Sequence, residues 1–175
     1  MKVSGKLVDI HKNRIFGATV SIENDRILSI EETHTYEEVF IMPGFIDAHV
    51  HIESSMLTPG SFAQASVPHG TIGVVSDPHE IANVIGIDGV IFMIEDGEKS
   101  PFKFYFGAPS CVPATEFETG GAILGSAEIE RLLERNDIKF LAEMMNFPGV
   151  VNGNSEVFKK IEIAKKFNKP IDGHA

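Results

Sequence analysis

The chain has 175 residues, with 15 Lys and Arg against 25 Asp and Glu, which gives a formal net charge of −10 at pH 7. This acidic balance argues against a nucleic-acid partner, because binding a polyanion requires Lys and Arg to neutralise its phosphates. The hydrophobic content of 43% is that of an ordinary globular protein, and no apolar stretch is long enough to predict a membrane span. With Cys111 as the single cysteine and no signal-peptide pattern at the start, we expect a cytoplasmic protein.

The first forty residues predict a small β-domain. Short apolar or alternating runs at 6–10, 18–22 and 26–30 are separated by turn residues, and Asn24-Asp25 predicts a tight hairpin between the last two. Strands of this length make only a small sheet, so we assign residues 1–41 to part of a small β-domain.

From residue 42 onward, predicted strands alternate with predicted helices. Apolar runs indicate strands at 44–50, 71–76, 102–107, 138–143 and 170–174. Cap residues and amphipathic patterns indicate a helix starting at Thr58-Pro59 and helices at 81–97, 126–136 and 154–168. This alternation predicts an α/β fold with parallel pairing, either as an open doubly wound sheet or as a barrel.

The absence of a Gly-rich phosphate turn after any predicted strand favours the barrel. A complete (β/α)8 barrel needs about 250 residues. We therefore interpret residues 42–175 as the first five βα units and expect the chain to be the N-terminal piece of a longer enzyme.

An HxH pattern closes the first of these strands. Because alternate residues of a strand point to the same side, His49 and His51 face one way and can hold a divalent metal, although packed or surface histidines are the simpler alternative. Asp47 lies on the same face and can orient the two imidazoles as an outer partner.

Acidic and imidazole side chains also follow the later strands. Asp77, His79 and Glu80 come directly after the second strand, where either a functional role or helix capping accounts for them. Glu143 and His174 end the fourth and fifth strands, and active sites of barrels lie at this end. Glu118 follows the third strand, where it either recognises a ligand edge or is simply solvated; the Gly120-Gly121 pair beside it allows a close backbone approach or makes a turn.

Five segments carry a family resemblance through essentially the whole chain. PGFIDAHVHIESSM, SDPHEIANV, SCVPATEFETGGA, AEMMNFPGV and DGHA together resemble adenine deaminases of the amidohydrolase superfamily. The resemblance implies a metal-dependent (β/α)8 barrel preceded by a small β-sandwich-type domain. It also implies hydrolytic deamination of adenine to hypoxanthine and ammonia by a metal-activated hydroxide, in purine salvage, by a homo-oligomer with no nucleic-acid or membrane partner.

The same resemblance implies a site with two divalent metals. His49 and His51 would bind one metal, Glu143 would bridge both, and His174 would bind the second. The family favours manganese or iron, and zinc also suits imidazole and carboxylate ligands. Asp77, His79, Glu80 and Glu118 would contact the purine or assist catalysis, and Asp47 would be the outer partner of the histidines.

Two other functions stay open from the residues alone. A cyclic-amide hydrolase of the dihydroorotase or hydantoinase type would share the HxH but would normally place a lysine at the end of the fourth strand. A metal-free scaffold fragment would use the histidines only for packing. Because the family expects further ligands on later strands, we also expect the 175-residue chain alone to be inactive and prone to aggregate.

Overall fold

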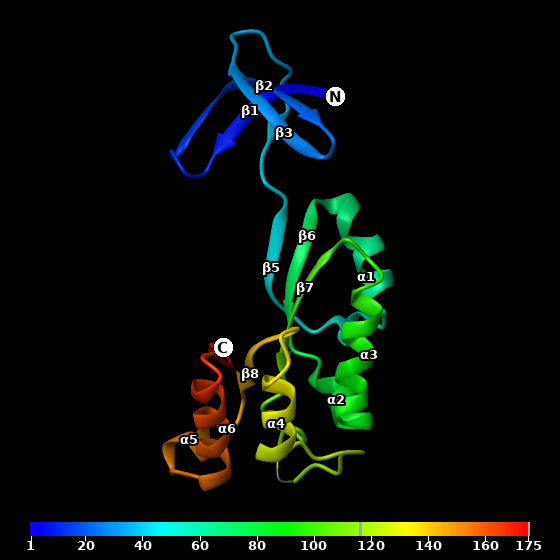
Figure 1. Cartoon of the computed structure of the whole chain (residues 1–175), viewed down its shortest axis with the longest axis vertical. Helices are drawn as coiled ribbons and strands as arrows, with labels where there is room; N and C mark the ends of the chain where they lie inside the picture. The colour runs from blue at the N-terminus through cyan, green and yellow to red at the C-terminus, as the bar shows by residue number, and fades with distance from the viewer. Residues whose placement is uncertain (116, 175) are drawn as a thin grey trace. The chain divides into compact units, whose positions relative to one another are not determined.

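A computed structural model describes residues 1–115 and 117–174, and the chain divides into two compact units, Met1–Gly44 and Phe45–Ala175 (Figure 1). Within these described ranges, none of the helices has both the length and the apolar character required to cross a membrane.

The first unit is a four-stranded sheet with the order β3-β2-β1-β4. Its strands are β1 (Lys2–Asp9), β2 (Arg14–Glu23), β3 (Arg26–Glu32) and β4 (Phe40–Ile41). The predicted hairpin at Asn24-Asp25 is confirmed, with φ of 50° and 58°, the left-handed backbone that such two-residue turns require. The first two strands are longer than the sequence runs because they pair along their whole length, from Lys2 opposite Ser21 to Asp9 opposite Arg14. This single sheet of the described residues does not show the second layer of a sandwich.

The second unit contains a five-stranded, all-parallel sheet with the order β5-β6-β7-β8-β9. Its strands are β5 (Phe45–Val50), β6 (Thr71–Ser76), β7 (Lys103–Ala108), β8 (Ile138–Met144) and β9 (Ile171–Gly173). Each strand pairs with the next along the chain, whereas a doubly wound sheet reverses its order at a switch point. The doubly wound alternative is therefore wrong, and the sheet fits the N-terminal part of a TIM-like barrel.

Helical segments connect these strands. They are η1 (Ile52–Ser55), α1 (Pro59–Ser66), η2 (Val67–His69), α2 (His79–Ile85), α3 (Ile87–Gly97), α4 (Ser126–Leu133), α5 (Phe147–Val151) and α6 (Ser155–Lys166). The single helix predicted over 81–97 is wrong, because Gly86 has φ +67° and separates α2 from α3.

The core of the second unit lies between the sheet and the helices. Val74, Phe106 and Leu141 from three neighbouring strands pack in one cluster with Met93 of α3 and Leu132 of α4. Each such side chain contributes about 1.5–3 kcal/mol when fully buried. This packing fixes the strands rigidly and so determines where the residues at their ends lie.

Candidate metal centre

The residues of the site come from the carboxyl ends of four strands of the second unit. His49 lies in β5 and His51 directly after it, Asp77 follows β6, Glu143 lies near the end of β8, and His174 follows β9. Parallel strands end at the same edge of a sheet, so these residues all lie at one edge of the sheet whose strands β5 to β8 are labelled in Figure 1.

Glu143 is the centre of this group. Its side chain is only 3% exposed, and each of its oxygens faces two imidazoles. Oε1 lies 3.2 Å from Nε2 of His51 and 3.7 Å from Nδ1 of His79. Oε2 lies 2.7 Å from Nδ1 of His174 and 3.6 Å from Nε2 of His49. The structure thus brings His49, His51, Glu143 and His174 together, and it adds His79 to them.

The charge on Glu143 is favoured by these neighbours. Burial alone raises the pKa of its carboxyl, but the hydrogen bond from His174 and the imidazoles of His51 and His49 outweigh burial, so its pKa lies below the ordinary value. A buried carboxylate surrounded by nitrogen donors is the arrangement expected of a cation ligand.

Contacts on the outer side of the rings orient the HxH pair. Nδ1 of His51 lies 3.0 Å from the backbone oxygen of Asp77. Because a carbonyl oxygen only accepts, Nδ1 carries the proton and Nε2 has a lone pair available for a metal. Nδ1 of His49 lies 3.6 Å from Oδ2 of Asp172. The two Nε2 atoms are 3.1 Å apart and so face the same point.

Buried Asp77 and half-buried His79 form a second pair beside Glu143. Nδ1 of His79 donates to Oδ2 of Asp77 over 3.0 Å. Burial raises the pKa of Asp77 although His79 opposes it, and the same contact holds the pKa of His79 above its ordinary value against the effect of burial. Among the described residues, Oδ1 of Asp77 has no hydrogen-bond partner although it is buried.

Four of these side chains can together hold a divalent cation. One ligand atom from each of His51, Asp77, His79 and Glu143 lies within 4.8 Å of all the others. Two imidazoles and two carboxylates suit zinc, manganese or iron. The buried carboxylates and the unpartnered Asp77 oxygen fit a cation, because an isolated buried charge is costly.

Two further carboxyl groups, those of Glu80 and Glu53, lie close to the cluster. Oε1 of Glu80 accepts a hydrogen bond from Ser54, and its other oxygen lies 3.6 Å from Nδ1 of His51. Glu53 accepts from the backbone N–H of Ile81, and burial raises the pKa of its carboxyl. Glu53 and Asp172 were not predicted, although both stand two residues from a histidine of the site, a spacing that can signal a shared face.

Two other predicted residues lie apart from the histidine rings. Oδ1 of Asp47 accepts a hydrogen bond from the backbone N–H of His49. Glu118 lines a cavity of about 970 Å³ together with residues such as Ser110, Leu124 and Lys160, and among the described residues none of the metal-ligating candidates lines it. The structure therefore does not bring Glu118 into the cluster.

The backbone at Gly120-Gly121 packs closely against helix α2. The N–H of Gly121 donates to the backbone oxygen of Asn83 in α2, and a Cβ at Gly121 would lie 2.2 Å from the oxygen of Val84. These contacts account for the glycine at position 121 by backbone packing.

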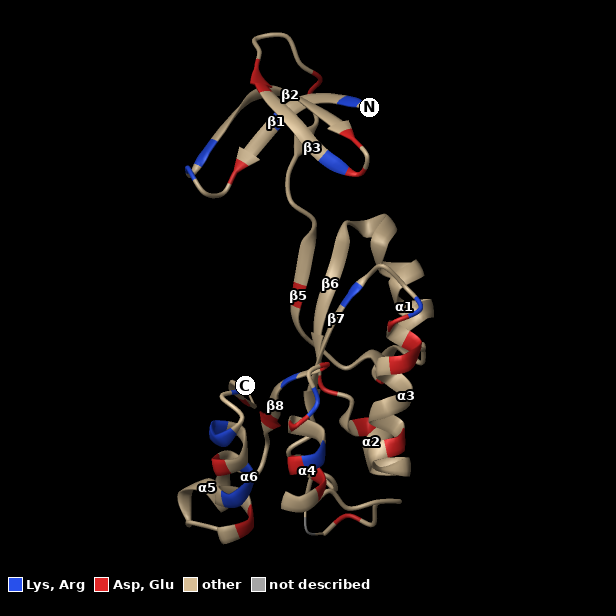
Figure 2. Ribbon diagram, viewed as in Figure 1, with Lys and Arg blue, Asp and Glu red and all other residues tan. Residues whose placement is uncertain are grey.

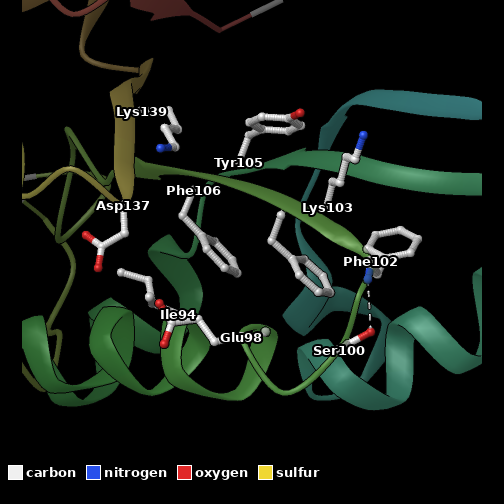
Figure 3. A pocket seen from close by; sticks show the side chains of 11 residues that line it. Ile94, Glu98, Ser100, Phe102, Lys103, Tyr105, Phe106, Asp137 and Lys139 are labelled. Atoms are coloured by element: carbon white, nitrogen blue, oxygen red, sulfur yellow. Dashed lines mark hydrogen bonds between the residues drawn. The ribbon is translucent and has the colours of Figure 1, made fainter. Parts of the chain in front are cut away.

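A second, smaller hollow lies at the opposite end of the sheet. It has a volume of about 310 Å³ and lies between α3 and the starts of β7 and β8, where Phe102, Phe106 and Lys139 are among its walls (Figure 3). Lys139 donates to the backbone oxygen of Asn136 at this amino end. The lysine of β8 is thus not at the end of the strand where Glu143 lies.

The sequence and the fold are similar to those of known proteins. Residues 40–175 match the profile of the amidohydrolase family. Proteins named adenine deaminase from Sulfurovum sp., Salinibacter ruber and Methanosarcina barkeri are 57%, 54% and 54% identical over 98–100% of this chain. The chain spans about one third of their length, 33%, 32% and 31% respectively.

Among solved structures, the crystal structure of 5-methylcytosine deaminase from Klebsiella pneumoniae, liganded with 5-fluorocytosine, aligns with a TM-score of 0.60 at 12% identity. The alignment covers 100% of this chain and 51% of that one, and it bears on the fold alone.

Proposed function

The chain belongs to the amidohydrolase family, and on this basis we propose that it forms the N-terminal part of an adenine deaminase. The observation that carries the proposal is Glu143, a buried carboxylate at the carboxyl end of β8 with imidazoles from three other strands around it. This arrangement supports metal-dependent hydrolysis. We propose adenine as the substrate because the similar proteins are named adenine deaminase.

We propose that the complete site holds two divalent cations, manganese or iron in preference to zinc. His49 and His51 would ligate one cation and His174 the other. Glu143 would be shared by both, since Oε1 faces His51 and Oε2 faces His174 and His49. When bound, such a cation lowers the pKa of a water molecule so that hydroxide is available near neutral pH.

The chain's own residues would then transfer protons and hold the purine in place. Replacing the C6 amino group of adenine with oxygen requires a proton on the ring and another on the departing nitrogen. Asp77 and His79 share a hydrogen bond and both have raised pKa values, so this pair can hold a proton beside the reacting base. We propose that Glu80 contacts the purine from beside His51, and that Glu118 could do so only from the separate cavity that it lines. Asp47 accepts a hydrogen bond from the backbone N–H of His49.

The lysine position argues against a cyclic-amide hydrolase. That alternative normally has a lysine where β8 ends, but Lys139 extends to the backbone of Asn136 at the other end of the strand. Glu143, near the end of β8, is the residue that we propose as the metal-bridging group in its stead.

We also propose the wider context of the chain. Residues 42–175 would be the first five units of a complete (β/α)8 barrel, and residues 1–41 part of a β-sandwich-type domain whose second layer lies elsewhere in the protein. The protein would be a cytoplasmic homo-oligomer of purine salvage, and the 175-residue chain alone would be inactive.

Metal removal from the full-length protein tests the proposal. The purified enzyme should form hypoxanthine and ammonia from adenine, lose this activity on chelation, and regain it with Mn²⁺. Dihydroorotate and hydantoin serve as control substrates and should remain unchanged. A protein with no stoichiometric metal would instead be the scaffold, and hydrolysis of a cyclic amide in preference to adenine would identify the other enzyme class.

A further inference from the structure

One lysine of α6 is buried, unlike its neighbours. Helix α6 carries four lysines, and Figure 2 shows basic residues along it. The side chains of Lys159, Lys165 and Lys166 are 63%, 61% and 63% exposed, and each pairs with a glutamate. Lys160 is 8% exposed, and no carboxylate pairs with it in the part of the chain that the structure describes.

The ammonium group of Lys160 donates to two backbone carbonyls. Nζ lies 2.7 Å from the oxygen of Ser110 and 2.7 Å from that of Leu124. Burial lowers the pKa of this lysine, which reflects the cost of removing its charge from water. An apolar side chain of the same length would fill the space without the cost of burying a charge. The hydrogen bonds from the Lys160 ammonium to the two carbonyls therefore account for a lysine at this position.

The two carbonyls mark the ends of one connecting segment. Ser110 lies just after β7 and Leu124 just before α4. Of the described residues in this segment, 110–115, 117, 118, 123 and 124 line the cavity of about 970 Å³. Lys160 therefore fastens both ends of this segment to α6. Glu156, one turn earlier in α6, accepts from the backbone N–H of Ser126 and strengthens the same attachment.

A second hydrogen bond continues from this attachment to the metal centre. The hydroxyl of Ser110 donates to the backbone oxygen of Glu143, the residue whose carboxylate faces the four imidazoles. The contacts thus run from Lys160 to Ser110 and from Ser110 to Glu143, with the donors and the Glu143 carboxylate buried.

We propose that Lys160 is a positioning residue of the metal centre, which holds Ser110 and the segment up to Leu124 in place and thereby fixes the main chain of Glu143. This role rests on one part of the proposed function, namely that the centre binds metal, and it does not depend on the identity of the substrate. Outer partners of metal ligands typically change affinity or activity by about 10- to 100-fold when removed.

Lys160→Met in the full-length protein removes the donors and keeps the apolar stem. The expected result is an about tenfold higher dissociation constant for Mn²⁺, measured by competition with a chelator, together with faster proteolytic cleavage between Ser110 and Leu124. The loss of kcat/KM for adenine should be of similar size.

Lys169→Met is the matched control. Lys169 also donates to three backbone carbonyls, those of Leu133, Arg135 and Ile138, but at the amino end of β8, away from the centre. This variant should lower the thermal midpoint and leave the Mn²⁺ dissociation constant within about twofold, because Lys169 makes the same kind of contact with backbone carbonyls at a distance from the centre. If Lys160→Met also leaves Mn²⁺ affinity unchanged while its thermal midpoint falls, Lys160 has a purely structural role and the inference is wrong.

Ser110→Ala tests the connection independently and covers a Lys160→Met protein that fails to fold. It should weaken Mn²⁺ binding by itself, and its effect with Lys160→Met should be smaller than the sum of the two, because both remove the same connection. Wild-type Mn²⁺ affinity in Ser110→Ala would overturn the inference. A wild-type enzyme that binds Mn²⁺ but leaves adenine intact would refute the proposed substrate and leave these affinity measurements valid.

Discussion

The two ends of the parallel sheet differ in how their polar groups are satisfied. At the amino end, Arg135 donates twice to Asp137 over 2.9 and 2.6 Å, and Lys169 donates to three carbonyls. At the carboxyl end lie the buried side-chain atoms that lack a hydrogen-bond partner within the described ranges, in Glu53, Ser76, Asp77, Glu80 and Asn83.

This difference indicates that the carboxyl end of the sheet serves function and the amino end serves stability. Unpartnered buried polar atoms are destabilising, so their concentration at one end fits a site where a cation, a substrate or ordered water contacts them. The satisfied amino end stabilises the fold, in agreement with the general separation of function and stability in barrels.

Glu143→Gln gives the largest expected effect on this comparison. The amide keeps the shape of the side chain but removes the charge between the imidazoles, so metal content and turnover of the full-length enzyme should both fall by more than about 100-fold. Metal analysis and an adenine assay measure this. Asp137→Asn, an acid-to-amide change at the amino end, should retain its metal, and a Glu143→Gln enzyme with normal metal and rate would move the bridging role to another residue.

Asp77→Asn should have a smaller effect. The amide oxygen can still accept from His79 but cannot take up a proton, so kcat/KM for adenine should fall by about 10- to 100-fold, with less metal lost than in Glu143→Gln. Asp96→Asn is the control, because Asp96 accepts from the N–H of Gly60 at the start of α1 and lies outside the site. Equal activity in the two variants would contradict a role for Asp77 in the reaction.

Gly121→Ala tests the backbone packing at the carboxyl end. Its Cβ would lie 2.2 Å from the backbone oxygen of Val84, so the free energy of unfolding should fall by about 1–3 kcal/mol. Gly153→Ala meets no atom within 4 Å but has φ +72°, and it should cost only about 1 kcal/mol. Urea unfolding of both full-length variants compares them, and a Gly121→Ala protein as stable as wild type would show that the segment shifts freely.

The smallest effect concerns acid pH at the amino end. The hydrogen bonds from Arg135 lower the pKa of Asp137 below its ordinary value, so the carboxylate stabilises the folded state above that ordinary value. The contribution is lost as the pH falls through the lowered pKa. Asp137→Asn should therefore reduce the decrease in thermal midpoint between neutral and acid pH, by an amount corresponding to about 1 kcal/mol or less. An unchanged pH dependence would show that this pair contributes nothing.

Local patterns in the sequence were sufficient for much of the architecture. Strand and helix alternation after residue 42 predicted the parallel sheet, and Asn154 predicted the start of α6, where its side chain accepts from two backbone N–H groups. Residues at strand ends, including His49, His51, Glu143 and His174, were named as a site because parallel strands end at one edge. The break at Gly86 was missed because the apolar pattern continues across it.

The sequence by itself determined which chemical groups stand at the ends of which strands, because periodicity and turn residues are local properties. Only the tertiary structure decided which groups touch. β5 and β9 are the outer strands of the sheet order, so the contact between His49 and Asp172 requires the sheet to curve. The same curvature brings His51 and His79 to one oxygen of Glu143. Packing of α6 against the segment after β7 buries Lys160 and leaves Lys159 exposed, although the two are adjacent in sequence and chemically identical. Contacts between residues distant in the chain depend on packing, which no local pattern encodes.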